Sequence, residues 1–193
     1  MARFVERRTG PLFCLYSFIT QRLNLGMRYQ PNRDYVSNDD IQTPRELARQ
    51  LVAHFAPTGR ILEPCAGDGH ILDCLPPGTE WCELKRGHDF LEHQSHYDWI
   101  ITNPPWSQIR AFLIHAFALA DNVVFLMTVN HAWTKARLRD MHAAGFGLRE
   151  IYLFPTPLSF PQSGFQLGAV HYQRGHENHL NLTRANSMPA PNA

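Results

Sequence analysis

The chain has 193 residues, of which 44% are hydrophobic and 11% aromatic, enough to build a core and too many for a disordered protein. Its formal net charge of +1 excludes a histone-like cationic protein, so contact with nucleic acid would need a local basic patch. The 4 cysteines show no CxxC spacing, and we expect reduced thiols in a cytoplasmic protein. No run of about 20 apolar residues occurs, so we expect no membrane contact.

The first 39 residues are expected to form an N-terminal extension that is partly irregular. Three arginines precede the apolar run 12–19, a pattern that superficially resembles a secretory signal. The run is short and contains Ser17, and no small-residue cleavage site follows it. The sequence therefore does not favour a signal peptide.

Helical and strand-like segments alternate between residues 40 and 173, the expected folded domain. Thr43 is predicted to cap a helix that has Pro44 in its first position and Glu46 completing a capping box. Apolar residues then recur at helical spacing up to Phe55. Short strands are expected at 60–63, 79–84 and 97–102, with a brief helix between the first two.

The second half of the domain continues the alternation. Ser107 is a plausible cap for a helix whose apolar positions run to Ala120. A buried strand is predicted at 123–127 and a helix at 133–144, before two strands at 148–154 and 166–172. From 174 to 193 the periodicity is lost, and we expect a disordered tail.

Strand–helix alternation with apolar strands indicates an α/β fold with a mostly parallel sheet and helices on both faces. In such sheets, ligands bind at the carboxyl ends of the strands, near the point where the strand order reverses. Polar residues that directly follow a predicted strand are therefore the candidates for a site.

The first such segment is 61–70, in which Glu63 ends a strand and Gly67 and Gly69 follow. The spacing is neither the GxGxxG dinucleotide fingerprint nor a P-loop. A small-residue loop that starts with a carboxylate suits a cationic or amine-bearing ligand. The alternative is an ordinary turn that uses its glycines for positive φ.

The second segment is Asn103-Pro104-Pro105-Trp106, directly after a predicted strand. Two prolines make the loop stiff and leave its carbonyls free. The Asn103 side chain and the Pro104 carbonyl can then accept the two N–H groups of a planar amine, while Trp106 stacks on its face. The alternative is a Pro-Pro turn beside a core tryptophan.

With these two motifs in this order, the chain resembles the S-adenosylmethionine-dependent amino-methyltransferases, in particular DNA adenine-N6 methyltransferases. Their (D/N/S)PP(Y/F/W) motif matches 103–106, and their first motif matches 63–69. A Thr-Pro pair of one subgroup matches Thr43 and Pro44. The resemblance covers about 40–172 and implies a Rossmann-like class I methyltransferase fold with an antiparallel strand near the C-terminus.

The resemblance also implies site residues. The cofactor's methionine part would be lined by Glu63, Ala66 and Gly67, and its ribose hydroxyls would be bound by Glu83. Asp89 and Phe90 would hold the adenine, although the usual helix between Glu83 and Asp89 is missing. The alternative for both acids is a solvated loop carboxylate.

Phe160 stands where the family often places an aromatic that sandwiches the flipped base; the alternatives are a hydrophobic plug, or Phe165 in that role. The histidines and cysteines are scattered, so no metal site is expected. A cytosine-C5 mechanism would need a nucleophilic cysteine in the catalytic loop, residues 103–106. It is not favoured, because that loop has no cysteine and Cys65 lies in the cofactor loop, residues 61–70.

Nucleic-acid phosphates could be met by Lys135 and Arg139, which share a helix face, with Arg110 and Arg137 nearby. The alternative is a solvated helix face. Because no target-recognition region is evident, we expect weak selectivity for sequence or a targeting partner. DNA is the expected substrate; an RNA base, a protein glutamine and an inactive binding partner remain the alternatives.

Overall fold

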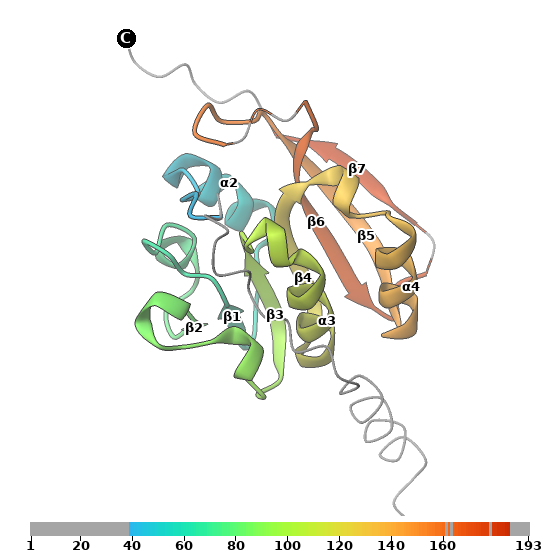
Figure 1. Cartoon of the computed structure of the whole chain (residues 1–193), viewed down its shortest axis with the longest axis horizontal. Coiled ribbons are helices and arrows are strands. Elements are labelled where there is room, and N and C mark those ends of the chain that lie inside the picture. The colour runs from blue at the N-terminus through green and yellow to red at the C-terminus, as the bar shows by residue number, and fades with distance from the viewer. Residues whose placement is uncertain (1–38, 161, 163, 178, 186–193) are drawn as a thin grey trace, which may run out of the picture. The chain divides into compact units, whose positions relative to one another are not determined.

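A seven-stranded sheet runs through the part of the chain that the structure describes (Figure 1). The structure is a computed structural model and describes residues 39–160, 162, 164–177 and 179–185. Across the sheet the strands follow the order β2, β1, β3, β4, β6, β5, β7. Their bounds are Ile61–Glu63 (β1), Glu80–Trp81 (β2), Tyr97–Thr102 (β3), Ala120–Thr128 (β4), Phe146–Phe154 (β5), Leu167–Arg174 (β6) and Asn181–Arg184 (β7).

The sheet is mostly parallel, as predicted. β1 pairs in parallel with β2 and β3, β3 with β4, and β5 with β7. Only β6 runs against its two neighbours, β4 and β5. Because the chain passes from β2 back across β1 to β3, the strand order reverses between the carboxyl ends of β1 and β3.

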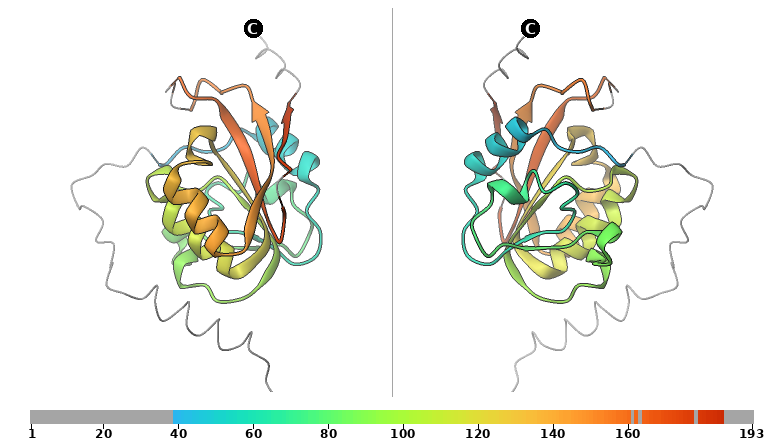
Figure 2. Two further views of the ribbon diagram at one scale, coloured as in Figure 1. Left: turned by 90° about the vertical axis from the view of Figure 1, so that its right-hand side faces the viewer. Right: turned by 90° about the vertical axis from the view of Figure 1, so that its left-hand side faces the viewer.

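Helices cover both faces of the sheet, which explains the apolar run of β4. Val123, Phe125 and Met127 face α3 and α4, whereas Val124 and Leu126 face α2, so every residue of this run is buried. The two views of Figure 2 show α3 and α4 together on one face and α2 on the other. The helix bounds are Arg45–Phe55 (α2), Ile109–Leu119 (α3) and Lys135–Ala143 (α4).

The predicted capping box at the start of α2 is wrong. Pro44 occupies the N-cap position, the helix begins at Arg45, and no side chain caps it. Glu46 instead accepts hydrogen bonds from side chains on its own helix. The start is displaced because Thr43 is buried and its carbonyl oxygen lies 2.6 Å from Nδ1 of His70.

The starts of the next two helices also differ from prediction. A 3₁₀ turn precedes α3, which begins at Ile109, because the amide and hydroxyl of Ser107 bond to Asp39 rather than cap the helix. In α4 the cap is Thr134, whose hydroxyl accepts a hydrogen bond from the Arg137 amide at 3.3 Å. The helix therefore begins two residues later than the predicted 133.

The predicted disordered tail is wrong for the described residues between 174 and 185. Arg174 ends β6 and donates to three carbonyl oxygens at the ends of α3 and α4, those of Phe117, Ala120 and Ala144. It also pairs with Asp121 at 3.0 Å. β7 then adds to the sheet edge beside β5; its four residues are all exposed, so no hydrophobic pattern marks it.

The connection from β2 to β3 contains two 3₁₀ turns, Leu84–Arg86 (η2) and Phe90–Glu92 (η3), and no α-helix. The predicted second strand shortens to two residues. Phe90 packs on two rings of α3, with centroid distances of 5.3 Å to Phe112 and 4.8 Å to His115. The missing helix is thus replaced by direct contact between η3 and α3.

Candidate active site

A cavity of about 590 Å³ opens where the strand order reverses, at the carboxyl ends of β1 and β3. Its wall is formed by the loops after β1, β2 and β3 and by residues 39–43, which we call the strap. Sites for small molecules commonly enclose about 300–1,000 Å³. The predicted residues that line it are Thr43, Ala66, Gly67, Glu83, Asp89, Phe90, Asn103 and Pro105. The predicted residues outside the lining are Pro44, Glu63, Pro104, Trp106, Lys135, Arg139 and Phe160.

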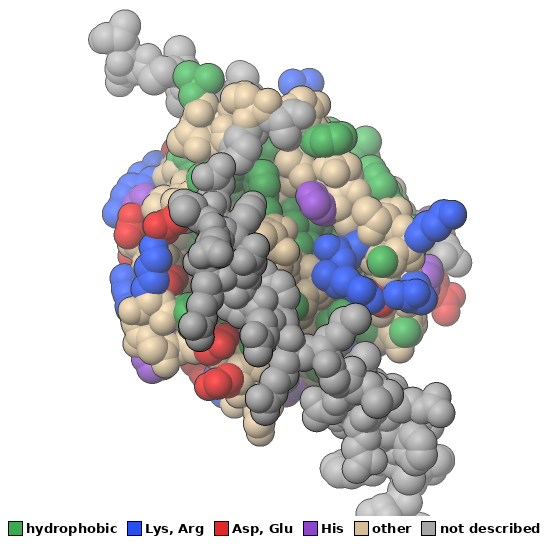
Figure 3. Space-filling view, viewed as in Figure 1, with side chains coloured by type: hydrophobic (Ala, Val, Ile, Leu, Met, Phe, Trp, Pro, Cys, Tyr) green, Lys and Arg blue, Asp and Glu red, His purple; other side chains and the backbone are tan. Residues whose placement is uncertain are grey.

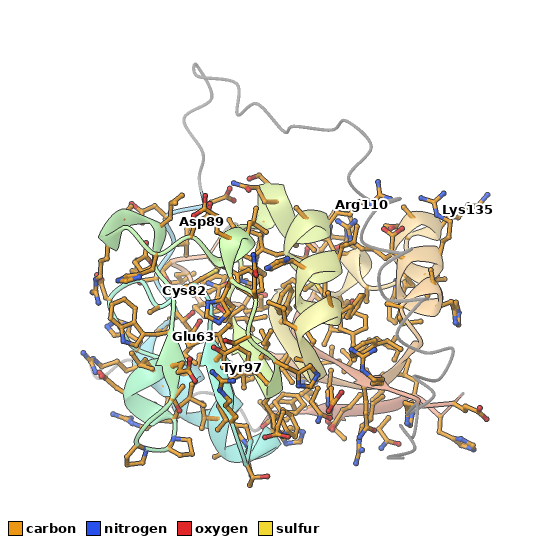
Figure 4. The ribbon with its side chains drawn as sticks, turned by 90° about the horizontal axis from the view of Figure 1, so that it is seen from below. Glu63, Cys82, Asp89, Tyr97, Arg110 and Lys135 are labelled. Carbon is orange, nitrogen blue, oxygen red and sulfur yellow. The ribbon has the colours of Figure 1, made fainter. Side chains whose placement is uncertain are left out.

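Glu63 is fully buried at the end of β1, inside the domain (Figure 4). Its Oε1 accepts a hydrogen bond from the Cys65 amide at 3.2 Å, and its Oε2 has no hydrogen-bond partner among the described residues. Burial raises the pKa of this carboxyl to about 8, although the nearby Thr102 hydroxyl and the Cys65 amide act in the opposite direction. The group is therefore largely neutral at pH 7 unless a cation lies beside it.

The raised pKa of Glu63 predicts a pH dependence of stability. Between the ordinary pKa of 4.5 and the folded-state pKa of about 8, the folded chain keeps a proton that the unfolded chain releases. Stability should therefore fall as the pH rises through this range. We expect Glu63→Gln, which stays neutral, to melt at least about 4 °C above the wild type at pH 8 and close to it at pH 4. Thermal unfolding at both pH values tests this, and an equal difference at both would contradict it.

Glu83 holds the first loop, residues 64–70 after β1, in place. Its Oε2 accepts a hydrogen bond from the Gly67 amide at 2.8 Å, and its Oε1 accepts one from the Lys85 amide at 3.0 Å. Arg86 donates to the Gly67 carbonyl at 3.0 Å, so one segment holds both the amide and the carbonyl of Gly67. A carboxylate accepts about four hydrogen bonds, which leaves Glu83 capacity for two hydroxyl groups of a ligand.

The acidic-aromatic pair 89–90 lines the cavity from η3. Asp89 caps this turn by accepting a hydrogen bond from the Leu91 amide at 2.9 Å. Phe90 is buried against α3, so its position is fixed by the core. Figure 4 shows Asp89 at the edge of the domain and Glu63 deeper inside it.

The strap contacts the first loop and η2. Gln42 Oε1 accepts a hydrogen bond from the Asp68 amide at 3.0 Å. The carboxylate of Asp40 lies 2.6 Å from the ammonium group of Lys85, and both residues line the cavity. Sequence reasoning missed Asp39, Asp40 and Gln42, because these residues carry no periodicity and no motif.

Asn103 stands at the end of β3, beside the cavity. Its Nδ2 donates a hydrogen bond to the Ile41 carbonyl of the strap at 3.2 Å. Its Oδ1 is buried and has no partner among the described residues. A rigid mount next to a cavity thus presents an acceptor that a ligand N–H can satisfy.

Trp106 and Phe160 contact each other directly. Their ring centroids are 5.9 Å apart, and the rings are tilted by 56°. Trp106 Nε1 donates a hydrogen bond to the Leu126 carbonyl at 3.3 Å, and Phe160 is buried. Phe160 is therefore a core residue in this arrangement, and a base could lie between the two rings only if Phe160 moved.

Basic side chains gather on α4 and the start of α3. Figure 3 shows a cluster of them on one face of the domain. In Figure 4, Arg110 and Lys135 lie along the same edge of the domain as Asp89. Arg110 is held by Asp140 at 2.7 Å, and Arg139 by the same carboxylate at 3.6 Å. Burial lowers the pKa of Arg137, whose Nε has no partner among the described residues.

Two features of the described residues bear on the class of site. No group of three or more His, Cys, Asp or Glu side chains is placed to hold a metal ion. Among the residues that the structure describes, no helix is both long and apolar enough to cross a bilayer. Burial raises the pKa of the Cys65 thiol well above its ordinary value, so this cysteine is a poor nucleophile.

Solved structures of low sequence identity share this fold. A protein assigned to the class I S-adenosylmethionine-dependent methyltransferases of Listeria monocytogenes matches with a TM-score of 0.56 at 10% identity, over 88% of this chain and 72% of that one. The M protein of the type I restriction enzyme EcoKI matches with a TM-score of 0.52 at 15% identity, over 70% of this chain and 44% of that one. The fold is therefore the Rossmann-like fold of class I methyltransferases.

A modification subunit assigned to a type I restriction enzyme of Vibrio vulnificus YJ016 also matches, with a TM-score of 0.52 at 14% identity, over 92% of this chain and 52% of that one. This chain thus spans about half the length of the two restriction-enzyme subunits. No family model and no curated protein sequence matches it.

Proposed function

We propose that this chain is an S-adenosylmethionine-dependent N-methyltransferase that methylates the exocyclic N6 amine of adenine in DNA. The observation that carries the proposal is the buried, unpartnered Oδ1 of Asn103 on the Pro-Pro loop, at the rim of a cavity that Gly67 and Glu83 also line. The amine would donate one N–H to this oxygen and the other to the Pro104 carbonyl.

The cavity fits the cofactor on three grounds. Its volume suits a nucleoside-sized ligand. Glu83 keeps capacity for ribose hydroxyls, and Asp89 and Phe90 line the wall where the adenine would lie. The buried Glu63 carboxyl, which lies behind the lining, would be driven toward its charged form by the cofactor's cationic groups.

The chain's own residues would act by positioning. When bound, S-adenosylmethionine supplies a sulfonium methyl group as the electrophile. Asn103 and the Pro104 carbonyl would orient the amine so that its lone pair faces that methyl group, and Trp106 would meet the face of the base once Phe160 had moved away from it. The N–CH₃ bond would form as the S–CH₃ bond breaks, which leaves a neutral thioether. The cationic nitrogen would then lose a proton to water, so no base with a shifted pKa is required.

DNA is the substrate that the resemblance and the fold favour together. Two of the matched structures are subunits of type I restriction enzymes, which supports DNA as the substrate and a targeting subunit as a partner. The basic cluster on α3 and α4 would meet the phosphates, and extruding the base would cost a few kcal/mol.

Incubation of the protein with labelled S-adenosylmethionine and separate DNA, RNA and protein pools tests the substrate class. Nucleoside mass spectrometry of DNA from cells that express the protein should then show N6-methyladenine. Label in RNA, or on glutamine in protein, would replace the DNA proposal with the corresponding alternative. If calorimetry detects no binding of S-adenosylmethionine, the protein would instead be an inactive binding partner.

The basic cluster predicts how DNA binding responds to salt. We expect Lys135→Gln with Arg139→Gln to lower the slope of log affinity against log salt concentration by about 1.8, because each lost phosphate contact removes about 0.9. Fluorescence anisotropy with labelled duplexes at several salt concentrations measures the slope. Arg149→Gln, on β5, is the matched control and should leave the slope unchanged. An unchanged slope in the double variant would assign Lys135 and Arg139 to a solvated face.

A further inference from the structure

The strap meets the first loop, residues 64–70, beside Gly67, where the backbone favours glycine. Gln42 Oε1 accepts the hydrogen bond of the Asp68 amide, and a Cβ added to Gly67 would lie 2.5 Å from the same oxygen. Gly67 also has a φ of +49°, which disfavours other residues. The close approach of the strap and the geometry of this loop therefore depend on each other.

At its other end the strap meets the catalytic loop at two points. Asp39 accepts hydrogen bonds from the amide of Ser107, at 3.2 Å, and from the hydroxyl of the same residue. The Ile41 carbonyl accepts the hydrogen bond of Asn103 Nδ2. Because Nδ2 is bound to the strap, the Asn103 amide cannot turn over without losing that bond. Oδ1 therefore remains the free acceptor.

We propose that the strap is a clasp that holds the cofactor loop and the catalytic loop in one arrangement, with Gln42 and Asp39 as positioning residues. Neither side chain needs to touch the amine or the methyl group. Their effect passes through Asp68 on one side and through Ser107 and Asn103 on the other. The effect on turnover rests on the proposed function, whereas the coupling of the two loops does not.

Amide hydrogen exchange on the full chain tests the coupling without any reaction. We expect Asp39→Ala to speed exchange about fivefold at Ser107, where a bond is lost, and also at Asp68, at the far end of the strap. Gln42→Ala should have the reciprocal effect at Ser107. Asp39→Asn and Gln42→Glu keep an acceptor and should restore slow exchange. Effects confined to the amide next to each substitution would overturn the clasp.

Kinetics with S-adenosylmethionine and DNA then test the effect on turnover. We expect Gln42→Ala and Asp39→Ala each to lower kcat about fivefold with little change in the KM for DNA, and the conservative variants to recover most of it. Asp73→Ala, which removes only an exposed ion pair with Arg45, should leave kcat unchanged. An unchanged kcat in both strap variants would overturn their positioning role. Coupled exchange in a protein that methylates no DNA would support the clasp and count against the proposed function.

Discussion

Asn103→Ala should lower the rate of methyl transfer to DNA by about 100- to 1,000-fold, the range found when a preorganised hydrogen-bonding group is removed from a reacting centre. The substitution removes the buried Oδ1 that has no partner among the described residues, and with it one of the two acceptors that we propose for the amine. Single-turnover kinetics with saturating S-adenosylmethionine measure this rate directly.

Cofactor affinity should stay within about threefold in Asn103→Ala, because the contacts of Gly67 with Glu83 do not involve this side chain. Asn103→Asp keeps the acceptors but cannot donate to the Ile41 carbonyl, so its rate should lie between those of the wild type and the alanine variant. Asn181→Ala, on the exposed strand β7, is the matched control. A wild-type rate in Asn103→Ala would remove the basis of the proposed mechanism.

Arg174→Ala should lower the free energy of unfolding by about 2–3 kcal/mol. Its guanidinium donates to carbonyl oxygens at the ends of α3 and α4, where helix dipoles favour positive charge, and it lies over the Phe146 ring at 4.6 Å. Charged hydrogen bonds contribute about 1.5–3 kcal/mol each, but part of the side chain is exposed, so the total is well below their sum. Urea unfolding followed by circular dichroism measures the loss.

Arg174→Lys should recover only part of this stability, because an ammonium group keeps the charge but not the forked geometry that reaches several carbonyls. Arg184→Ala is the matched control, since it removes an exposed arginine from β7 and should change stability by less than about 0.5 kcal/mol. A loss in Arg174→Ala as small as that of the control would mean that the residue does not anchor the helix ends.

The sequence predicts the parts of this fold that depend on apolar patterning. β3 has the predicted bounds 97–102, and β4 extends the predicted strand at both ends because its apolar run is buried on two faces. The first loop and the Asn103 loop are predicted to meet because both follow parallel strands at the reversal of strand order. In the structure, Gly67, Glu83 and Asn103 line one cavity.

Polar contacts between distant residues could not be predicted in this way. The strap reaches partners 26 residues away at Asp68 and 68 residues away at Ser107, through bonds that leave no periodic trace. Arg174 stands two residues after the last apolar residue of its strand, so the sequence predicts the start of a tail there, although its partners lie at the ends of α3 and α4 and at the start of β4. The family resemblance predicts that Phe160 lies beside the base. In the structure it packs on Trp106, a tertiary contact that the local sequence does not encode.

The short connection between β2 and β3 packs directly on α3. Phe90 helps to line the cavity and rests on Phe112, and the Nε2 of His115 lies 3.0 Å from the carbonyl of His93. If the connection were longer and formed its own helix, its sequence could change without altering the packing of α3. In this chain Phe112 also lines the cavity, so a substitution there would disturb both η3 and the helix that follows the Asn103 loop.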